Sequence, residues 1–160
     1  MNRKYKQLSD FSRELVNISS LDKGLPFISA KAKEIIGADR CSVFIYSPSI
    51  NELWTTLSDG VEKIVVPYDM GIVGKTIQKE QAILENDAYS NPSFLSEIDM
   101  QTGYYTKNIL TAPVINSDKE VIGVFQLLNK EDGFTKEDLE FIVFFAHYIS
   151  GFLELELKTT

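Results

Sequence analysis

Gln126 is the polar residue of this chain that is best placed to recognise a ligand. Residues 121–128 form an apolar, β-branched run, which predicts a strand. Alternation would put the Gln126 amide on one face of that strand with the side chains of Ile122, Val124 and Leu128. An amide buried there without a partner costs about 1–3 kcal/mol. A nucleobase edge or the backbone of a nearby loop would satisfy it, and the pattern leaves both open.

Two predicted helix starts could present backbone N–H groups to an anion. Gly71-Ile72-Val73-Gly74 opens one helix, and its glycines would let an anion approach the backbone closely. Asn91-Pro92-Ser93-Phe94-Leu95 offers a second start, with Pro92 at the first helical position. The net charge of -7 repels anions at long range. A phosphate site would therefore have to act at short range, through the backbone.

Two further polar groups have both a functional and a structural interpretation. Asp99, Thr102 and Thr106 recur every three or four residues, which on a helical turn aims them at one spot, although a solvated, hydrogen-bonded loop fits equally well. The Asp59 carboxylate could accept a hydrogen bond from a ring nitrogen or an amine. The sequence Asp59-Gly60 is also ordinary turn chemistry.

Composition excludes several classes of function. His147 and Cys41 are the single histidine and the single cysteine, so a metal cluster or a Cys-His pair has no evident members, and we expect no enzyme, no metal and no cofactor. The acidic charge argues against nucleic acid as a partner. No apolar run approaches the roughly 18 residues of a membrane span, and no secretory signal opens the chain. We therefore expect a cytoplasmic domain that does not contact a membrane.

Hydrophobic periodicity predicts an α+β domain. Helices are expected at 4–20, 22–36 and 71–79 and from residue 135 onward, and strands at 41–47, 52–57, 63–66, 82–84, 109–115 and 121–128. This order suggests a central antiparallel sheet, with the terminal helices on one face and loops and short helices on the other. Thr135 and Asp138 are spaced to cap the last helix. We divide the chain into a dimerisation helix (1–20), a main domain (21–154) and the start of a connecting helix (155–160).

Several separated segments resemble a GAF domain of the branch that binds cyclic nucleotides. They are Gly71–Gly74, residues 99–110, and the residues Asn129, Lys130, Phe134 and Asp138, which match most of the N-K-F-D-E signature of phosphodiesterase-type GAF domains. Leu139 stands where the final glutamate of that signature would be. The resemblance covers residues 25–153 and implies the GAF fold. We expect Lys130 and Asp138 to form a structural salt bridge.

The resemblance also implies a set of ligand contacts. Ser42 belongs to a Cys-Ser-Val-Phe arrangement that such domains share and would line the ligand site. Ser58 and Asp59 lie at the turn where these domains place base-contacting groups, and Gln126, which would also contact the base, stands where they often carry a glutamate. The cyclic phosphate would meet backbone groups of Ile72, Val73 and Leu95, and Leu95 replaces a tyrosine of some relatives. Asp99, Thr102 and Thr106 would close over ribose and phosphate.

From this resemblance we expect a sensor domain that binds a cyclic nucleotide, cyclic AMP in preference to cyclic GMP. Ligand binding would shift the terminal helices, which would pair in a homodimer and signal to a cyclase, phosphodiesterase, diguanylate cyclase or kinase domain. One alternative is a ligand-free dimerisation and relay module built on the apolar seams of 4–20 and 135–157. Another is a sensor of a different small molecule.

Overall fold

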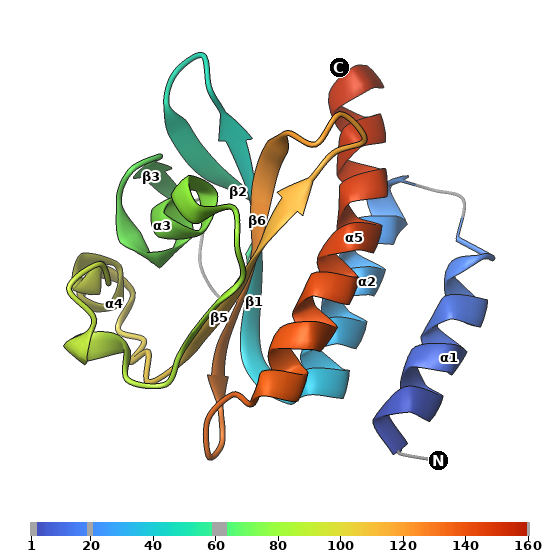
Figure 1. Cartoon of the computed structure of the whole chain (residues 1–160), viewed down its shortest axis with the longest axis horizontal. Helices are drawn as coiled ribbons and strands as arrows, with labels where there is room; N and C mark the ends of the chain where they lie inside the picture. Colours follow the sequence, from blue (N-terminus) through green and yellow to red (C-terminus); the bar gives the residue numbers. More distant parts are fainter. Residues whose placement is uncertain (1–2, 19–20, 59–63, 160) are drawn as a thin grey trace.

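A computed structural model describes residues 3–18, 21–58 and 64–159, and it has the α+β architecture expected from the sequence. Six antiparallel strands form one sheet in the order β3-β2-β1-β6-β5-β4 (Figure 1). The strands are β1 (Ala38–Ser47), β2 (Glu52–Ser58), β3 (Val65–Pro67), β4 (Ile83–Glu85), β5 (Ile109–Ile115) and β6 (Val121–Lys130). The helices are α1 (Arg3–Leu15), α2 (Leu21–Ile36), α3 (Gly71–Lys79), α4 (Ser96–Thr102), α5 (Lys136–Thr159) and the 3₁₀ turn η1 (Ala88–Ser90).

Helices α2 and α5 cover one face of the sheet, as the sequence predicts. Their inward stripes, which include Ile28, Ala32, Ile142 and Ile149, are fully buried against the sheet in the main hydrophobic core. Helix α2 ends where expected, because Gly37 takes a left-handed φ of 92° and its N–H donates to the Lys33 carbonyl. The opposite face of the sheet is therefore left to α3, η1 and α4.

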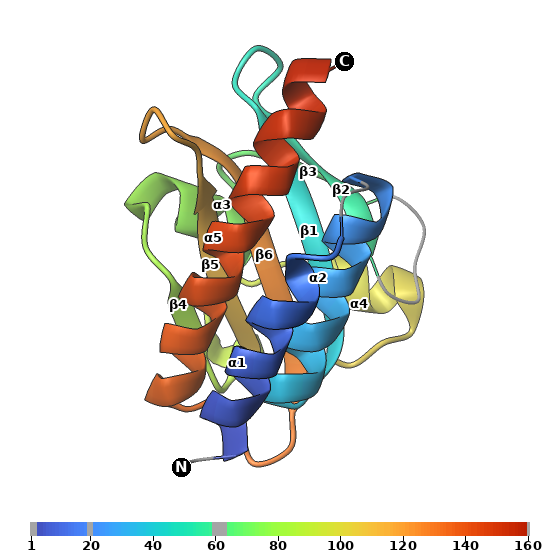
Figure 2. The ribbon, with the colours of Figure 1, turned by 90° about the vertical axis from the view of Figure 1, so that its right-hand side faces the viewer.

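Helix α1 lies over α2 and α5 as an outer layer (Figure 2). Its Phe11 ring is 1% exposed and stacks on Phe27, with centroids 5.7 Å apart, while the ring of Phe145 meets it edge-on at 5.1 Å. The apolar stripe of the predicted 4–20 helix is thus buried within its own chain. The helix itself ends at Leu15, and residues 19–20 lie outside the described part.

A β-bulge in β6 changes the face on which one predicted side chain lies. Val114 pairs with Gly123, but Ile115 pairs with Val121, so Ile122 is the extra residue of the bulge. Ile122 consequently packs with the helix-side core, whereas Val124 packs on the opposite face. The prediction that Ile122 shares a face with Gln126 is wrong, because simple alternation assumes an unbroken ladder.

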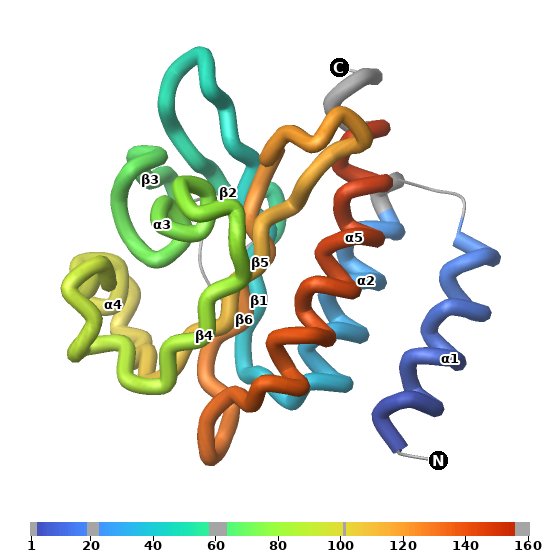
Figure 3. Tube along the Cα trace, in the orientation of Figure 1, coloured from blue at the N-terminus to red at the C-terminus, as the bar shows by residue number. Residues whose placement is uncertain are grey.

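The segment between β4 and β5 leaves the sheet and returns to it, as the chain trace in Figure 3 shows. The prediction of a helix start at Pro92 is wrong. Asn91 closes a turn there instead, because its side-chain oxygen accepts the Ser93 N–H at 2.8 Å and its carbonyl accepts the Phe94 N–H at 3.1 Å. Helix α4 begins four residues later, at Ser96. We name residues 94–106 the lid.

The junction of β6 and α5 contains the expected salt bridge and helix cap. Lys130 Nζ lies 2.6 Å from a carboxylate oxygen of Asp138, whose side chain is 0% exposed. Asp138 also accepts the Thr135 N–H at 2.8 Å, and the Thr135 hydroxyl accepts the Asp138 N–H at 3.1 Å, which completes the capping box. Lys4 of α1 adds a second ammonium at 3.4 Å. The buried carboxylate therefore ties α1, β6 and α5 together.

Candidate functional site

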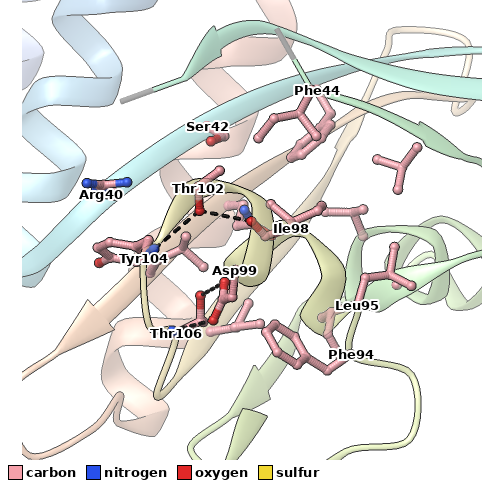
Figure 4. Close-up of a pocket in the computed structure, with 18 residues that line it drawn as sticks. Arg40, Ser42, Phe44, Phe94, Leu95, Ile98, Asp99, Thr102, Tyr104 and Thr106 are labelled. Atoms are coloured by element: carbon pink, nitrogen blue, oxygen red, sulfur yellow. Dashed lines mark hydrogen bonds between the residues drawn. The ribbon is translucent and has the colours of Figure 1, made fainter. Parts of the chain in front are cut away.

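A pocket lies between the sheet, the start of α3 and the lid, on the face that α2 and α5 leave uncovered (Figure 4). It holds about 690 Å³ of space free of atoms, part of which is open to solvent. Eight of the ten residues predicted to bind a ligand line it: Ser42, Ile72, Val73, Leu95, Asp99, Thr102, Thr106 and Gln126. That these residues bind a ligand stays a prediction.

The floor of the pocket is made by alternate residues of β1 and β6. Ser42 pairs directly with Gln126 across the two strands. Phe44 and Leu128 continue the same rows, so the two polar side chains are set in an otherwise apolar surface. Such a floor suits a flat, largely apolar ring with a polar edge.

The Gln126 amide makes no hydrogen bond to any residue that the structure describes. The side chain is half-buried and lines the pocket. An amide carries two N–H donors and one carbonyl acceptor, so an edge with both donors and acceptors would complement it. Gln126 thus has unused hydrogen-bonding capacity at the pocket.

Helix α3 begins at the pocket without a side-chain cap. Its N-cap residue is Met70, which makes no capping hydrogen bond, and Gly71 has a left-handed φ of 77°. The first helical hydrogen bond joins the Gly74 N–H to the Met70 carbonyl, so the N–H groups of Ile72 and Val73 precede the helical ladder. These donors and the helix dipole create a positive potential at the pocket wall.

Leu95 lines the pocket beside this helix start. Its side chain would lie 3.1 Å from a Cβ placed on Gly71, so the lid packs closely on the beginning of α3. Leu95 is the N-cap residue of α4 and likewise makes no side-chain capping bond. Helix α4 is only seven residues long, so its dipole is shorter than that of α3.

Asp99 is already bound by the protein's own donors. Its carboxylate accepts the Thr106 N–H at 2.6 Å, the Thr106 hydroxyl at 2.8 Å and the Tyr89 hydroxyl at 2.7 Å. This bond to Asp99 raises the pKa of Tyr89 to about 12, so the phenol remains a donor at neutral pH. Asp99 and Thr106 do meet, but not on one helical turn, because α4 ends at Thr102 and Thr106 lies in the loop beyond it. Their hydrogen bonds hold the lid together.

The remaining predicted polar residues are Thr102, Ser58 and Asp59. The Thr102 hydroxyl donates to the Ile98 carbonyl at 2.9 Å within its own helix, so it does not converge on Asp99. Ser58 pairs with Ser42 at the end of β2. Asp59 lies outside the described residues.

Two polar side chains of the pocket, Arg40 and Tyr104, were missed by the sequence reasoning. The Arg40 guanidinium lies 3.8 Å from the centroid of the Tyr104 ring. Alternation along β1 would have put Arg40 on the face of Ser42, had the strand been expected to begin at Ala38 and not at Cys41. The sequence contains no pattern that predicts the position of the Tyr104 side chain, because this position depends on the path of the lid.

The signature residues lie beside the pocket and not among those that line it. Phe134 is 3% exposed and belongs to the main core, and Lys130 and Asp138 form the salt bridge described above. The Asn129 side chain accepts the Lys107 N–H at 2.7 Å and donates to the Tyr105 carbonyl at 2.8 Å. Asn129 therefore fixes the end of the lid to β6.

The described residues contain neither a membrane-spanning helix nor a metal-ligand cluster. No helix within the ranges described is both long and apolar enough to cross a membrane. No group of three or more histidine, cysteine or acidic residues is placed to hold a metal ion in that part of the chain.

Comparison with known proteins identifies relatives of two kinds. The chain is 30% identical over 154 residues to a cGMP-specific 3',5'-cyclic phosphodiesterase of Drosophila mojavensis; the match covers 86% of this chain and 14% of the phosphodiesterase. The chain thus corresponds to a small part of the length of that relative.

Solved structures support the fold. The GAF domain of a phosphoenolpyruvate-protein phosphotransferase from Coxiella burnetii has a TM-score of 0.85 at 20% identity and covers 98% of this chain and 95% of its own. A free methionine-R-sulfoxide reductase from Neisseria meningitidis reaches 0.80 at 16% identity, with 98% and 92% covered. At such identities the likeness concerns the fold alone.

The family model of the GAF domain matches residues 21–153. This match spans the whole sheet, α2 and most of α5. GAF domains are regulatory sensor domains, which agrees with the expectation that this segment is not an enzyme. Taken with the fold and the pocket, the match shows that the chain belongs to the GAF domain family.

Proposed function

We propose that this GAF domain is a sensor that binds a cyclic nucleotide in the pocket between the sheet and the lid. The observation that carries the proposal is that two groups with unused hydrogen-bond donors line the same pocket. These are the uncapped start of α3, which attracts an anion, and the Gln126 amide, which can read a base edge. An apolar floor between them suits a purine ring. The phosphodiesterase likeness favours the same ligand class.

The polarity of the site also fits a ligand with one negative charge. The N–H groups at α3 are a short-range, backbone-built anion site, as a protein of net charge -7 requires. Arg40 is a further positive group on the pocket wall. A cyclic phosphate carries a single charge, whereas a linear monophosphate approaches two.

For the base we favour adenine, in keeping with the expectation from the sequence. An amide offers a donor and an acceptor side by side, which complements the N6 amine and the ring nitrogen of adenine. Cyclic GMP is the comparison ligand, because it is named for the related phosphodiesterase. We further propose that the domain acts as a dimer in a larger cytoplasmic signalling protein and passes ligand binding to an output domain through its terminal helices.

Cyclic AMP should stabilise the folded domain by mass action. We expect about 2.7 kcal/mol at a ligand concentration one hundred times the dissociation constant, with a smaller gain for cyclic GMP. Thermal unfolding with cyclic AMP, cyclic GMP, 5'-AMP and 5'-GMP measures this directly. If none of these raises the melting temperature, the proposal fails and the ligand-free relay function is favoured.

Replacing Gln126 with glutamate should reverse the preference between the two bases. A carboxylate only accepts, so it loses the bond to the adenine ring nitrogen and gains the N1 and N2 hydrogens of guanine. We expect the ratio of the two dissociation constants, measured by calorimetry, to change by about tenfold or more toward cyclic GMP. Gln78→Glu, on the exposed side of α3, is the matched control for the added charge. An unchanged ratio would remove Gln126 from the base site.

A further inference from the structure

The lid is attached to the rest of the protein at its base, through Tyr89 and at its far end. At its base, Phe94 packs with Ile72 and Ile109, and the Leu95 side chain lies against the start of α3. Helix α4 itself packs extensively against no other helix or strand of the described residues. Tyr89 of η1 holds the middle of the lid, because its hydroxyl donates to Asp99 at 2.7 Å and its ring stacks on that of Tyr105 at 4.9 Å. The far end of the lid is held by further contacts of individual side chains.

Tyr104 makes three of those contacts, and all three reach the sheet. Its hydroxyl donates to an Asp39 carboxylate oxygen at 2.7 Å and accepts the Asn129 side-chain N–H at 3.0 Å. Its ring lies under the Arg40 guanidinium, 3.8 Å from the centroid. Residues 39 and 40 belong to β1 and residue 129 to β6, so one lid side chain bridges the two central strands.

The Arg40 guanidinium has N–H donors available for a bound ligand. It makes no salt bridge or hydrogen bond to any residue in the described ranges. Its cation–π contact there is with the Tyr104 ring. A guanidinium stacked on a ring keeps its N–H edge free. Because Arg40 also lines the pocket, it lies where the closed lid, the sheet and a bound ligand would meet (Figure 4).

Asn129 holds the Tyr104 hydroxyl from the other side. Its backbone takes a left-handed φ of 59°, a conformation that asparagine tolerates better than most residues. The same side chain also bonds the backbone of Tyr105 and of Lys107, so the amide orients Tyr104 and the end of the lid together.

We propose that Asp39, Arg40, Tyr104 and Asn129 form a clasp that keeps the lid closed over the pocket, and that opening this clasp admits and releases the ligand. Tyr104 is the positioning residue of the clasp, because it is the member that belongs to the lid. The part of this inference that concerns ligand exchange rests on the proposed function. The part that concerns lid opening does not.

The clasp is tested first without ligand, by hydrogen exchange of the α4 amides. Tyr104→Phe keeps the ring over Arg40 but removes both hydroxyl bonds, and Asp39→Ala removes the acceptor without altering the lid. We expect either change to raise α4 exchange about tenfold, with the melting temperature within the range of the control. Tyr105→Phe is the matched control, since its ring is 60% exposed and no hydrogen bond of its hydroxyl is recorded in the described structure. Exchange equal to the control in both variants would overturn the clasp.

Ligand kinetics then test the gating step. In stopped-flow measurements with cyclic AMP, Tyr104→Phe should raise the dissociation rate constant about tenfold, and Tyr105→Phe should leave it unchanged. If the rate constants match while α4 exchange rises, the lid opens as proposed but does not limit ligand release, and the gating claim fails. If no nucleotide binds the wild-type protein, the proposed function and the gating claim fail together, whereas the exchange experiment still decides the clasp.

Discussion

Replacing Lys130 with methionine should lower the free energy of unfolding by about 3 kcal/mol at pH 7. The change leaves the Asp138 carboxylate, which is 0% exposed, without the ammonium that lies 2.6 Å away. Removing one member of a buried ion pair is costly because the remaining charge is neither paired nor hydrated. We place the loss at the lower end of the usual range because Lys4 remains 3.4 Å from the same carboxylate. Urea unfolding measures it.

Two variants separate this buried-charge effect from a general effect of losing a lysine. Lys136→Met removes a charge from the exposed first turn of α5 and should change stability by less than about 0.5 kcal/mol. Adding Asp138→Asn to Lys130→Met removes the stranded charge and should restore part of the lost stability. A double variant no more stable than Lys130→Met would show that the uncompensated carboxylate is not the cause.

The contribution of Asp138 to the free energy of unfolding should depend on pH with opposite signs in the wild-type protein and in Lys130→Met. Burial alone would raise the pKa of Asp138, but the hydrogen bonds from Lys130 and Thr135 and the charges of Lys130 and Lys4 outweigh it, so this pKa lies below its ordinary value. The wild-type protein should therefore hold this stability above about pH 4 and lose it as the pH falls further. Without Lys130, burial dominates and the pKa rises. The deficit of Lys130→Met should then shrink as the pH falls from 7 toward 4, and a constant deficit would contradict the assignment.

The sequence predicted the regular parts of this fold and failed where the backbone departs from regularity. The stripe of Ile28 and Ala32, the stop at Gly37 and the Thr135 cap follow from local chemistry, and the structure contains all of them. Ile122 was placed on the wrong face because a bulge depends on how two strands pair, which period-two reasoning ignores. The predicted helix start at Pro92 failed for a similar reason. The Asn91 side chain accepts a backbone N–H that a helix start would leave without a partner, and so forms a turn.

The candidate site was predictable as a list of residues but not as an arrangement. Ser42 and Gln126 follow from strand alternation, and register then pairs them. The roles of Asp99 and Tyr104 could not be derived in this way, because both depend on which donors the lid folds back upon. Arg40 was missed because β1 begins earlier than its apolar run. Polar residues in irregular segments are positioned by long-range contacts, which one sequence does not display.

Replacing Asp99 with alanine should release the lid even when no ligand is present. The change strands the Thr106 N–H and hydroxyl, whose residue is 2% exposed, and frees the Tyr89 hydroxyl. Hydrogen bonds to a charged acceptor contribute about 1.5–3 kcal/mol each, and the burial of Thr106 hinders water from replacing the two that it makes. We expect the lid to lose about 3 kcal/mol of local stability, up to the limit set by its own opening free energy. Hydrogen exchange of residues 96–106 measures this.

Graded variants decide whether Asp99 builds the lid or contacts the ligand. Asp99→Asn keeps one carbonyl oxygen for Thr106 and should fall between wild type and alanine, while Glu97→Ala, on the exposed side of the same helix, should leave lid exchange unchanged. If the lid of the alanine variant exchanges like wild type while nucleotide affinity is lost, the carboxylate contacts the ligand, as the resemblance implied. If lid exchange and affinity change together across the series, Asp99 acts by holding Thr106 and Tyr89. The bonding in the closed lid favours this second result, because the Asp99 oxygens already accept three donors.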